Sequence, residues 1–173
     1  MDGMLSQEEI NALLTGMSSN LDNVSDSNTE SLSEEEKDAI GEVSNISMGT
    51  AATTLSSLVN QKVIITTPVV SYANWQDLAE NYDRPCVFIQ IYYKDGLQGS
   101  NILILKENDV KIITDLMMGG DGSNIENSLS DLHLSAISEA MNQMMGSAAT
   151  SISSMLGKRV DISPPTAELI DLN

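Results

Sequence analysis

The sequence predicts an α+β fold in which two long helices, related by a pseudo-two-fold axis, pack on a β-sheet. Three observations lead to this expectation. Residues 33–60 and 131–156 carry apolar residues at helical spacing. Several shorter segments rich in Val, Ile and Thr are typical of strands. The chain also matches itself at a shift of 97 residues, which indicates an internal duplication.

The chain begins with a short amphipathic segment, residues 1–17, in which Ser6 and Glu9 have the spacing of a capping box. Its apolar residues are Leu5, Ile10, Leu13 and Leu14. Residues 18–32 are polar and acidic without periodicity, which predicts a flexible linker. A lone helix of this length is marginal in water, so its apolar residues need a surface. Its own domain could supply that surface, but the long linker favours a separate partner.

Residues 33–173 are predicted to form one α+β domain. Ser33 and Glu36 form a second capping box that opens the first long helix. Residues 62–68 follow as a strand, and residues 69–85 are irregular. A hairpin comes next, with arms at residues 87–93 and 99–105. A shorter helix follows at residues 109–118, then the second long helix at 131–156 and a last strand at 160–163. Gly157 marks the end of the second long helix.

Composition restricts the possible functions. The chain has 173 residues, with 8 Lys and Arg against 25 Asp and Glu and a formal net charge of −17. Such a chain repels nucleic acid and anionic lipid, so its partners are expected to be proteins. One cysteine excludes an internal disulfide framework and fits a reducing cytoplasm. No apolar run approaches the length of a membrane span, and the first residues do not resemble a signal peptide.

Several familiar catalytic arrangements are missing. His133 is the only histidine and Cys86 the only thiol, which argues against a His/Cys metal site and a Cys–His nucleophile pair. The glycine-rich residues 119–122 lack the Lys and Ser/Thr of a P-loop, so a turn that ends a helix is the better interpretation. No metal ligands are therefore predicted.

The duplication aligns residues 38–68, the first copy, with residues 135–165, the second copy, and 14 of the 31 positions are identical without a gap. Glu42 and Asn45 align with Glu139 and Asn142. In each copy the residues at i, i+4 and i+7 lie on one face of the helix. The opposite face is predicted to point toward the core, through Ile40, Val43, Ala51 and Leu58 in the first helix and Ile137, Ala140, Met144 and Met155 in the second.

A single Glu-x-x-Asn carries little information, but Asn is unfavourable inside a helix, and here it occurs at the same place in both copies. Packing or a hydrogen bond between helices is one explanation. The other is chemical, because an amide has both a donor and an acceptor and can orient a water molecule. Phosphoryl transfer depends mainly on positioning, and Gln orients the attacking water in small GTPases. The Glu would then be a docking charge for a Lys of the substrate protein.

The pattern Asp/Ser-x-x-x-Glu-x-x-Asn, followed after 22 residues by Pro, occurs twice in register. It resembles the signature of the CheC/CheX/FliY family of phosphatases that act on CheY-phosphate, and the resemblance covers residues 33–170. Residues 5–14 are similar to the N-terminal peptide of the switch proteins FliM and FliY that binds CheY-phosphate. The combination of tail and duplicated domain resembles the FliY branch of the family.

The resemblance implies hydrolysis of the aspartyl-phosphate of a CheY-type regulator at the cytoplasmic flagellar switch. Glu42 and Glu139 would contact a Lys of the regulator, and Asn45 and Asn142 would place the attacking water. Leu5, Ile10, Leu13 and Leu14 would dock the regulator. The chain would need no cofactor of its own, since Mg²⁺ would be bound by the regulator. Implied partners are phosphorylated CheY and the switch proteins FliM, FliG and FliN-like proteins. The alternative is a switch or adaptor module that binds phosphorylated CheY without catalysis.

The sequence departs from the resemblance in two respects. A FliN-like domain is not recognisable, and the second copy has its helix and first strand without the hairpin and helix that follow in the first copy. We therefore expect a second repeat that is truncated, or a chain that is a fragment of a longer protein, with both Glu/Asn faces retained.

Overall fold

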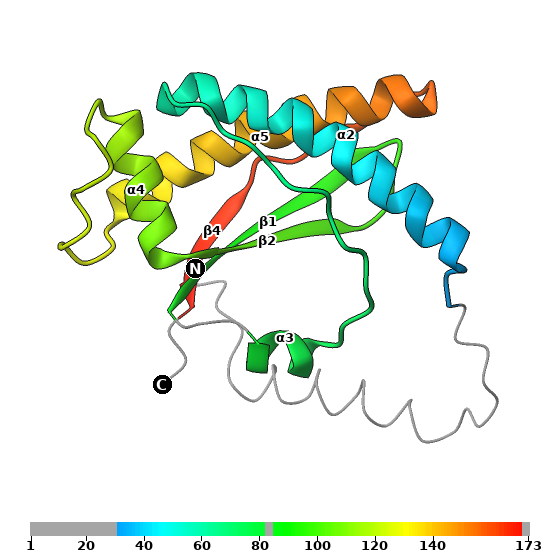
Figure 1. Cartoon of the computed structure of the whole chain (residues 1–173), viewed down its shortest axis with the longest axis horizontal. Helices are drawn as coiled ribbons and strands as arrows, with labels where there is room; N and C mark the ends of the chain where they lie inside the picture. Colours follow the sequence, from blue (N-terminus) through cyan, green and yellow to red (C-terminus); the bar gives the residue numbers. More distant parts are fainter. Residues whose placement is uncertain (1–30, 82–84, 171–173) are drawn as a thin grey trace, which may run out of the picture. The chain divides into compact units, whose positions relative to one another are not determined.

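The computed structural model describes residues 31–81 and 85–170. Its helices are α2 (Glu34–Val59), α3 (Trp75–Asn81), α4 (Glu107–Met117) and α5 (Asp131–Leu156), and its strands are β1 (Cys86–Asp95), β2 (Ser100–Lys106), β3 (Asp161–Ile162) and β4 (Thr166–Ile170). The long helices α2 and α5 pack against each other on one face of the sheet (Figure 1). The predicted α+β architecture is confirmed, and the strand pairs are all antiparallel.

Strand β1 is the centre of the sheet. It pairs with β2 along one edge, from Cys86 with Lys106 to Tyr92 with Ser100. Its other edge is shared by β4, which pairs with residues 86–90, and by β3, which pairs near Tyr93. Pro164 and Pro165 lie between β3 and β4, where the missing backbone N–H groups interrupt the ladder. Strand β4 was not expected from the sequence.

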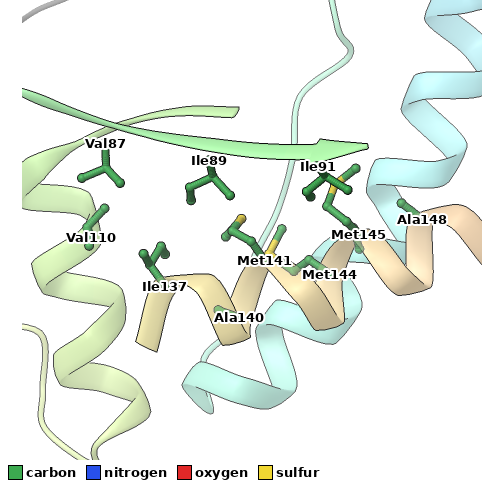
Figure 2. Close-up of a cluster of buried hydrophobic side chains, with 11 residues drawn as sticks. Val87, Ile89, Ile91, Val110, Ile137, Ala140, Met141, Met144, Met145 and Ala148 are labelled. Atoms are coloured by element: carbon green, nitrogen blue, oxygen red, sulfur yellow. The ribbon is translucent and has the colours of Figure 1, made fainter. Parts of the chain in front are cut away.

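The main core lies between β1 and helices α4 and α5. Figure 2 shows the side chains of β1 facing those of α5, with Val110 of α4 beside them. Cluster members from these three elements are Val87, Ile89, Ile91, Val110, Ile137, Ala140, Met141, Met144, Met145 and Ala148. The methionines at this contact are buried core residues, which agrees with their place in an apolar helical pattern.

The duplication is visible in the local geometry at the end of each long helix. Asn60 and Gly157, 97 residues apart, both have positive φ, at 50° and 63°. The hydroxyl of Ser56 accepts a hydrogen bond from the Val63 N–H at 3.0 Å. The hydroxyl of Ser153 accepts the equivalent bond from Val160 at 2.8 Å. The same helix end is therefore built twice.

The helices also carry matching side-chain bonds to their own backbone. Thr53 donates to the Gly49 carbonyl at 3.2 Å, and Thr150 donates to the Gly146 carbonyl at 3.0 Å. Small residues of both helices are buried, namely Ala51, Ala52, Ala148 and Ala149. These pairs show the duplication again in the local structure of the two helices.

Three sequence predictions were wrong. Residues 62–68 do not form a strand, because within the described residues no strand lies beside them to complete a ladder. Ile40 does not enter the core and is 42% exposed, and Met155 is 36% exposed at the end of α5. Residues 69–85, predicted to be irregular, contain the short helix α3.

None of the helices in the described part of the chain is long and apolar enough to cross a membrane.

The buried polar contacts include an ion pair in α4, in which Lys111 lies 2.6 Å from Glu107. Lys111 is 7% exposed, so its ammonium group is paired where water has little access. The N-terminal docking segment and most of the predicted linker lie outside the described residues.

Candidate functional site

The Glu-x-x-Asn face of α5 forms one wall of a shallow depression of about 460 Å³, here called the second depression. Its opposite wall comes from the chain around Pro164 and Pro165, which links β3 to β4. The lining residues are Leu134, Ser135, Ser138, Glu139, Asn142, Pro164, Pro165 and Ala167. Glu139 and Asn142 are both exposed, so this face is accessible to a partner.

The equivalent face of α2 borders a depression of the same volume, about 460 Å³, here called the first depression. Its lining residues are Glu34, Lys37, Asp38, Gly41, Glu42, Thr67, Pro68, Val69 and Val70. A shift of 97 residues superimposes most of this lining on that of the second depression, including Glu42 on Glu139 and Pro68 on Pro165. The duplication has therefore produced two similar surface sites, each between a helix face and the proline of its own copy.

The two asparagines differ in position. Asn142 is exposed and lines the second depression, whereas Asn45 is half-buried and lies outside the lining of the first. The hydrogen bond between the two helices joins the hydroxyls of Thr54 and Ser147 at 2.6 Å. Among the described residues neither Asn45 nor Asn142 takes part in this contact, so the bond between the two helices does not account for the repeated Asn.

The two glutamates also differ in their neighbours. The side-chain amide of Gln143 donates a hydrogen bond of 2.6 Å to the carboxylate of Glu139. At the equivalent place in the first copy, four residues after Glu42, stands Ile46, which cannot donate such a bond. The Glu139 carboxylate is consequently fixed on one side by its own helix.

A lysine enters the first depression where the second has Leu134. The ammonium group of Lys37 lies 2.8 Å from the Glu34 carboxylate and 5.5 Å from the centre of the Tyr72 ring. The hydrogen bond to Glu34 raises the pKa of the Lys37 amine, so Lys37 is charged at neutral pH. The first depression therefore contains a Lys37–Glu34 ion pair in addition to Glu42, which the second does not.

The groups gathered at these faces can position and dock, but they do not form a nucleophilic or metal-binding centre. Among residues 31–81 and 85–170, no cluster of His, Cys, Asp and Glu could hold a metal ion. Cys86 is a buried free thiol in β1. The ring nitrogen Nδ1 of His133 accepts a hydrogen bond from the Ser130 N–H at 3.1 Å, at the start of α5. Neither residue lines the depressions.

The sequence predicted Glu42, Asn45, Glu139 and Asn142, and the structure brings each Glu together with its own Asn on one helix face. Lys37 and Gln143 were not predicted, because each differs from its equivalent, Leu134 or Ile46, and a search for repeated residues passes over such positions. The predicted docking residues Leu5, Ile10, Leu13 and Leu14 lie outside the described residues and stay a prediction.

Comparison with protein families gives a match to the CheC-like family at residues 35–72 and 132–169. Both ends of the second match lie 97 residues after those of the first, which agrees with the duplication. The flagellar motor switch phosphatase FliY of Bacillus subtilis is 52% identical over 168 residues, which are 97% of this chain and 44% of that protein. The chain thus spans less than half the length of this relative.

Among solved structures, FliY of Thermotoga maritima is 46% identical and superimposes with a TM-score of 0.76, over 81% of this chain and 71% of that one. A FliG–FliM complex from H. pylori contains a similar fold, with a TM-score of 0.66 at 18% identity over 78% of this chain and 75% of that one. The second likeness shows the fold alone. The matches to the family and to the two FliY proteins, together with the repeated Glu/Asn faces, show that this chain belongs to the CheC-like family.

Proposed function

We propose that this chain hydrolyses the aspartyl-phosphate of a CheY-type response regulator at the flagellar motor switch. The observation that carries the proposal is the pair of equivalent depressions, each lined by the Glu of a Glu-x-x-Asn helix on one side and by a proline on the other, with Asn142 lining the second as well. The relative from Bacillus subtilis is named a flagellar motor switch phosphatase, and it shares 52% identity with this chain.

The amides of Asn45 and Asn142 position the attacking water in this proposal. An amide can accept a hydrogen bond from a water molecule while it donates another to a phosphoryl oxygen. Catalysis of phosphoryl transfer comes mostly from positioning and charge stabilisation. A phosphatase that acts on the regulator therefore needs to supply little beyond a group that positions the water. The regulator supplies the aspartyl-phosphate and its Mg²⁺, so the chain needs no metal ion of its own.

Glu42 and Glu139 dock the regulator by pairing with a Lys of its active site. Glu139 is exposed and its carboxylate is held by Gln143, which presents a fixed charge beside Asn142. The acidic chain as a whole, at −17, favours association with a basic surface. Electrostatic complementarity of this kind mainly increases the rate and specificity of encounter.

The proposed location is the cytoplasmic switch of the flagellar motor. The structural relative from H. pylori was solved as a FliG–FliM complex, and this chain has the same fold as a part of it. FliM, FliG and FliN-like proteins are proposed as partners besides phosphorylated CheY, as the resemblance to the FliY branch implies. The apolar residues of the N-terminal segment are proposed to capture the regulator.

The experiment that tests this function is phosphate release from a phosphorylated CheY with and without the chain. We expect the chain to accelerate release, and we expect a variant with Asn45→Ala and Asn142→Ala to lose the acceleration. Circular dichroism of the variant serves as the folding control. Binding of the regulator without any accelerated release would overturn the proposal in favour of an adaptor without catalysis.

A further inference from the structure

The chain that links β3 to β4 and walls the second depression contains one residue more than the stretch of β1 beside it. Strand β4 pairs with β1 as far as Gln90 opposite Thr166, and β3 takes over at Tyr93 opposite Ile162. The step from 90 to 93 in β1 is three residues, while the step from 162 to 166 is four. The extra residue makes a β-bulge at residues 163–165, and bulges next to functional sites re-aim the chain.

A proline explains why the pairing cannot continue in register. If the pairing of β4 with β1 ran on by two residues, Tyr92 would lie opposite Pro164. Two residues at such a position of an antiparallel ladder exchange two N–H···O bonds. Proline has no N–H to donate, so the Tyr92 carbonyl would lose its partner. The shift by one residue brings Ser163 to this place instead.

Ser163 supplies both groups that the ladder needs opposite Tyr92. Its N–H donates to the Tyr92 carbonyl at 2.7 Å, and its side-chain hydroxyl accepts a hydrogen bond from the Tyr92 N–H at 3.0 Å. In a regular ladder a backbone carbonyl would accept the second bond. The same hydroxyl donates to the Pro164 carbonyl at 3.2 Å. A single hydroxyl therefore ties the central strand of the sheet to Pro164, while the backbone of Ser163 is free to bend.

Pro164 and Pro165, here called the proline wall, line the second depression on the side opposite α5. Across the depression stand Glu139 and Asn142. Ser163 is half-buried and is not part of the lining. It can therefore influence a regulator in the depression only through the proline wall that it anchors.

The first copy has no comparable anchor among the described residues. The residue equivalent to Ser163 is Thr66, which also carries a hydroxyl but is exposed. Residues 62–68 belong to no strand, so the proline of the first depression, Pro68, is not tied to a sheet in this way. The two sites thus differ in the anchoring of their walls as well as in the place of their asparagines.

We propose that Ser163 is a positioning residue of the second site, whose hydroxyl fixes the proline wall at the separation from Glu139 and Asn142 that lets a docked regulator present its phosphoryl group to the Asn142 amide. This role rests on the proposed phosphatase function, whereas the anchoring of the wall is a property of the chain alone. A misplacement of about 1 Å can cost about 100-fold in rate. Loosening the wall therefore slows turnover and leaves the docking charge of Glu139 in place.

The test is made in an Asn45→Ala background, in which only the second copy keeps its amide. Ser163→Ala removes the hydroxyl, Ser163→Thr keeps it, and Ser163→Val has the size of threonine without the hydroxyl. Hydrogen exchange of the Tyr92 amide is measured by NMR. We expect exchange faster by about tenfold in Ser163→Ala and Ser163→Val, and exchange as slow as in the background chain in Ser163→Thr.

Phosphate release from a phosphorylated regulator is measured on the same variants. Single-turnover release at saturating chain should slow by about fivefold in Ser163→Ala and Ser163→Val and should be restored in Ser163→Thr. Affinity for the regulator should change by less than about twofold, because Glu139 is untouched. The matched control is Ser56→Ala, which removes a hydroxyl that accepts the Val63 N–H at the end of α2. It should leave the release rate of this background unchanged.

Three results overturn the proposal. Slow exchange of Tyr92 in Ser163→Ala would remove the anchor, and fast exchange with an unchanged release rate would leave Ser163 a merely structural residue. Equal release rates in Ser163→Thr and Ser163→Val would show that the hydroxyl is not the group that acts. If the parent chain itself does not accelerate release, the proposed phosphatase function fails and the positioning role falls with it, while the exchange of Tyr92 still decides whether Ser163 anchors the wall.

Discussion

Helices α2 and α5 descend from the same repeated pattern, but they lie in different environments. The inner face of α5 is buried under the hairpin and α4, while the inner face of α2 ends in an open groove. Their outer faces are more alike, since both carry a Glu-x-x-Asn beside a proline. The same sequence pattern therefore has two roles. The outer face of each helix forms the candidate site, and the inner face becomes part of the core only where other elements cover it, as the hairpin and α4 cover α5.

The largest expected difference between the copies is in stability. Ile137→Ala should lower the free energy of unfolding by about 2–5 kcal/mol, because it leaves a cavity in a close-packed cluster. Ile40→Ala should cost less than about 1 kcal/mol, since its side chain is 42% exposed. Urea unfolding of both variants against the parent measures this. Equal losses at the two positions would mean that the inner face of α2 is buried as well.

The next difference concerns the amides. Asn142→Ala should lower kcat by about tenfold, because Asn142 is exposed in the second depression beside a Glu held by Gln143. Asn45→Ala should lower it by only about a tenth, because Asn45 is half-buried outside the lining of the first depression and the second copy then carries most of the rate. Steady-state phosphate release gives both values. If Asn45→Ala has the larger effect, the first copy is the more active one.

The sequence predicted the long helices closely, because their signals are local. A capping box, Ser33 with Glu36, precedes the first helix, and positions 60 and 157 end the two helices in the left-handed conformation. Strands depend on neighbours, and this explains the two errors there. Residues 62–68 have strand composition and form no ladder, while β4 forms because β1, far away in the sequence, lies beside it.

The same reasoning explains how far the site could be predicted. Glu42, Asn45, Glu139 and Asn142 were found because they occur at equivalent positions in both copies. Asn is unfavourable inside a helix, so its presence in both copies indicates a role. What makes the two sites unequal lies in residues the copies do not share. The lysine in the first depression and the Gln143–Glu139 hydrogen bond became visible only from the folded geometry.

The docking charges should show a smaller difference between the copies. Glu139→Lys should raise KM by about three- to tenfold through repulsion of the regulator's Lys, with little change in kcat. Glu42→Lys should raise it by less, because Asn45 lies outside the lining of the first depression, so that copy contributes less of the measured rate. Titration of the regulator in the phosphate-release assay distinguishes the two. Unchanged kinetics in both variants would reduce these glutamates to surface charges.

The smallest expected effect lies in the N-terminal segment. Deletion of residues 1–17 should raise KM by a few-fold and leave kcat unchanged, because a linker of about 15 residues spans about 20 Å and holds a captured regulator close to the domain. Leu13→Ala with Leu14→Ala should have the same effect. A peptide of residues 1–20, titrated with phosphorylated and unphosphorylated regulator, provides the binding test. Equal affinity for the two forms, or none, would contradict the docking role.

The central claim is that the two amides act on the water and not on binding. The most direct measurement is single-turnover phosphate release from a phosphorylated regulator at saturating chain, with regulator binding measured in parallel for the parent and the Asn45→Ala, Asn142→Ala variant. We predict that the variant binds the regulator as tightly as the parent does, while release slows by about 100-fold or to the regulator's own rate. A variant that binds and releases phosphate as fast as the parent would contradict the account.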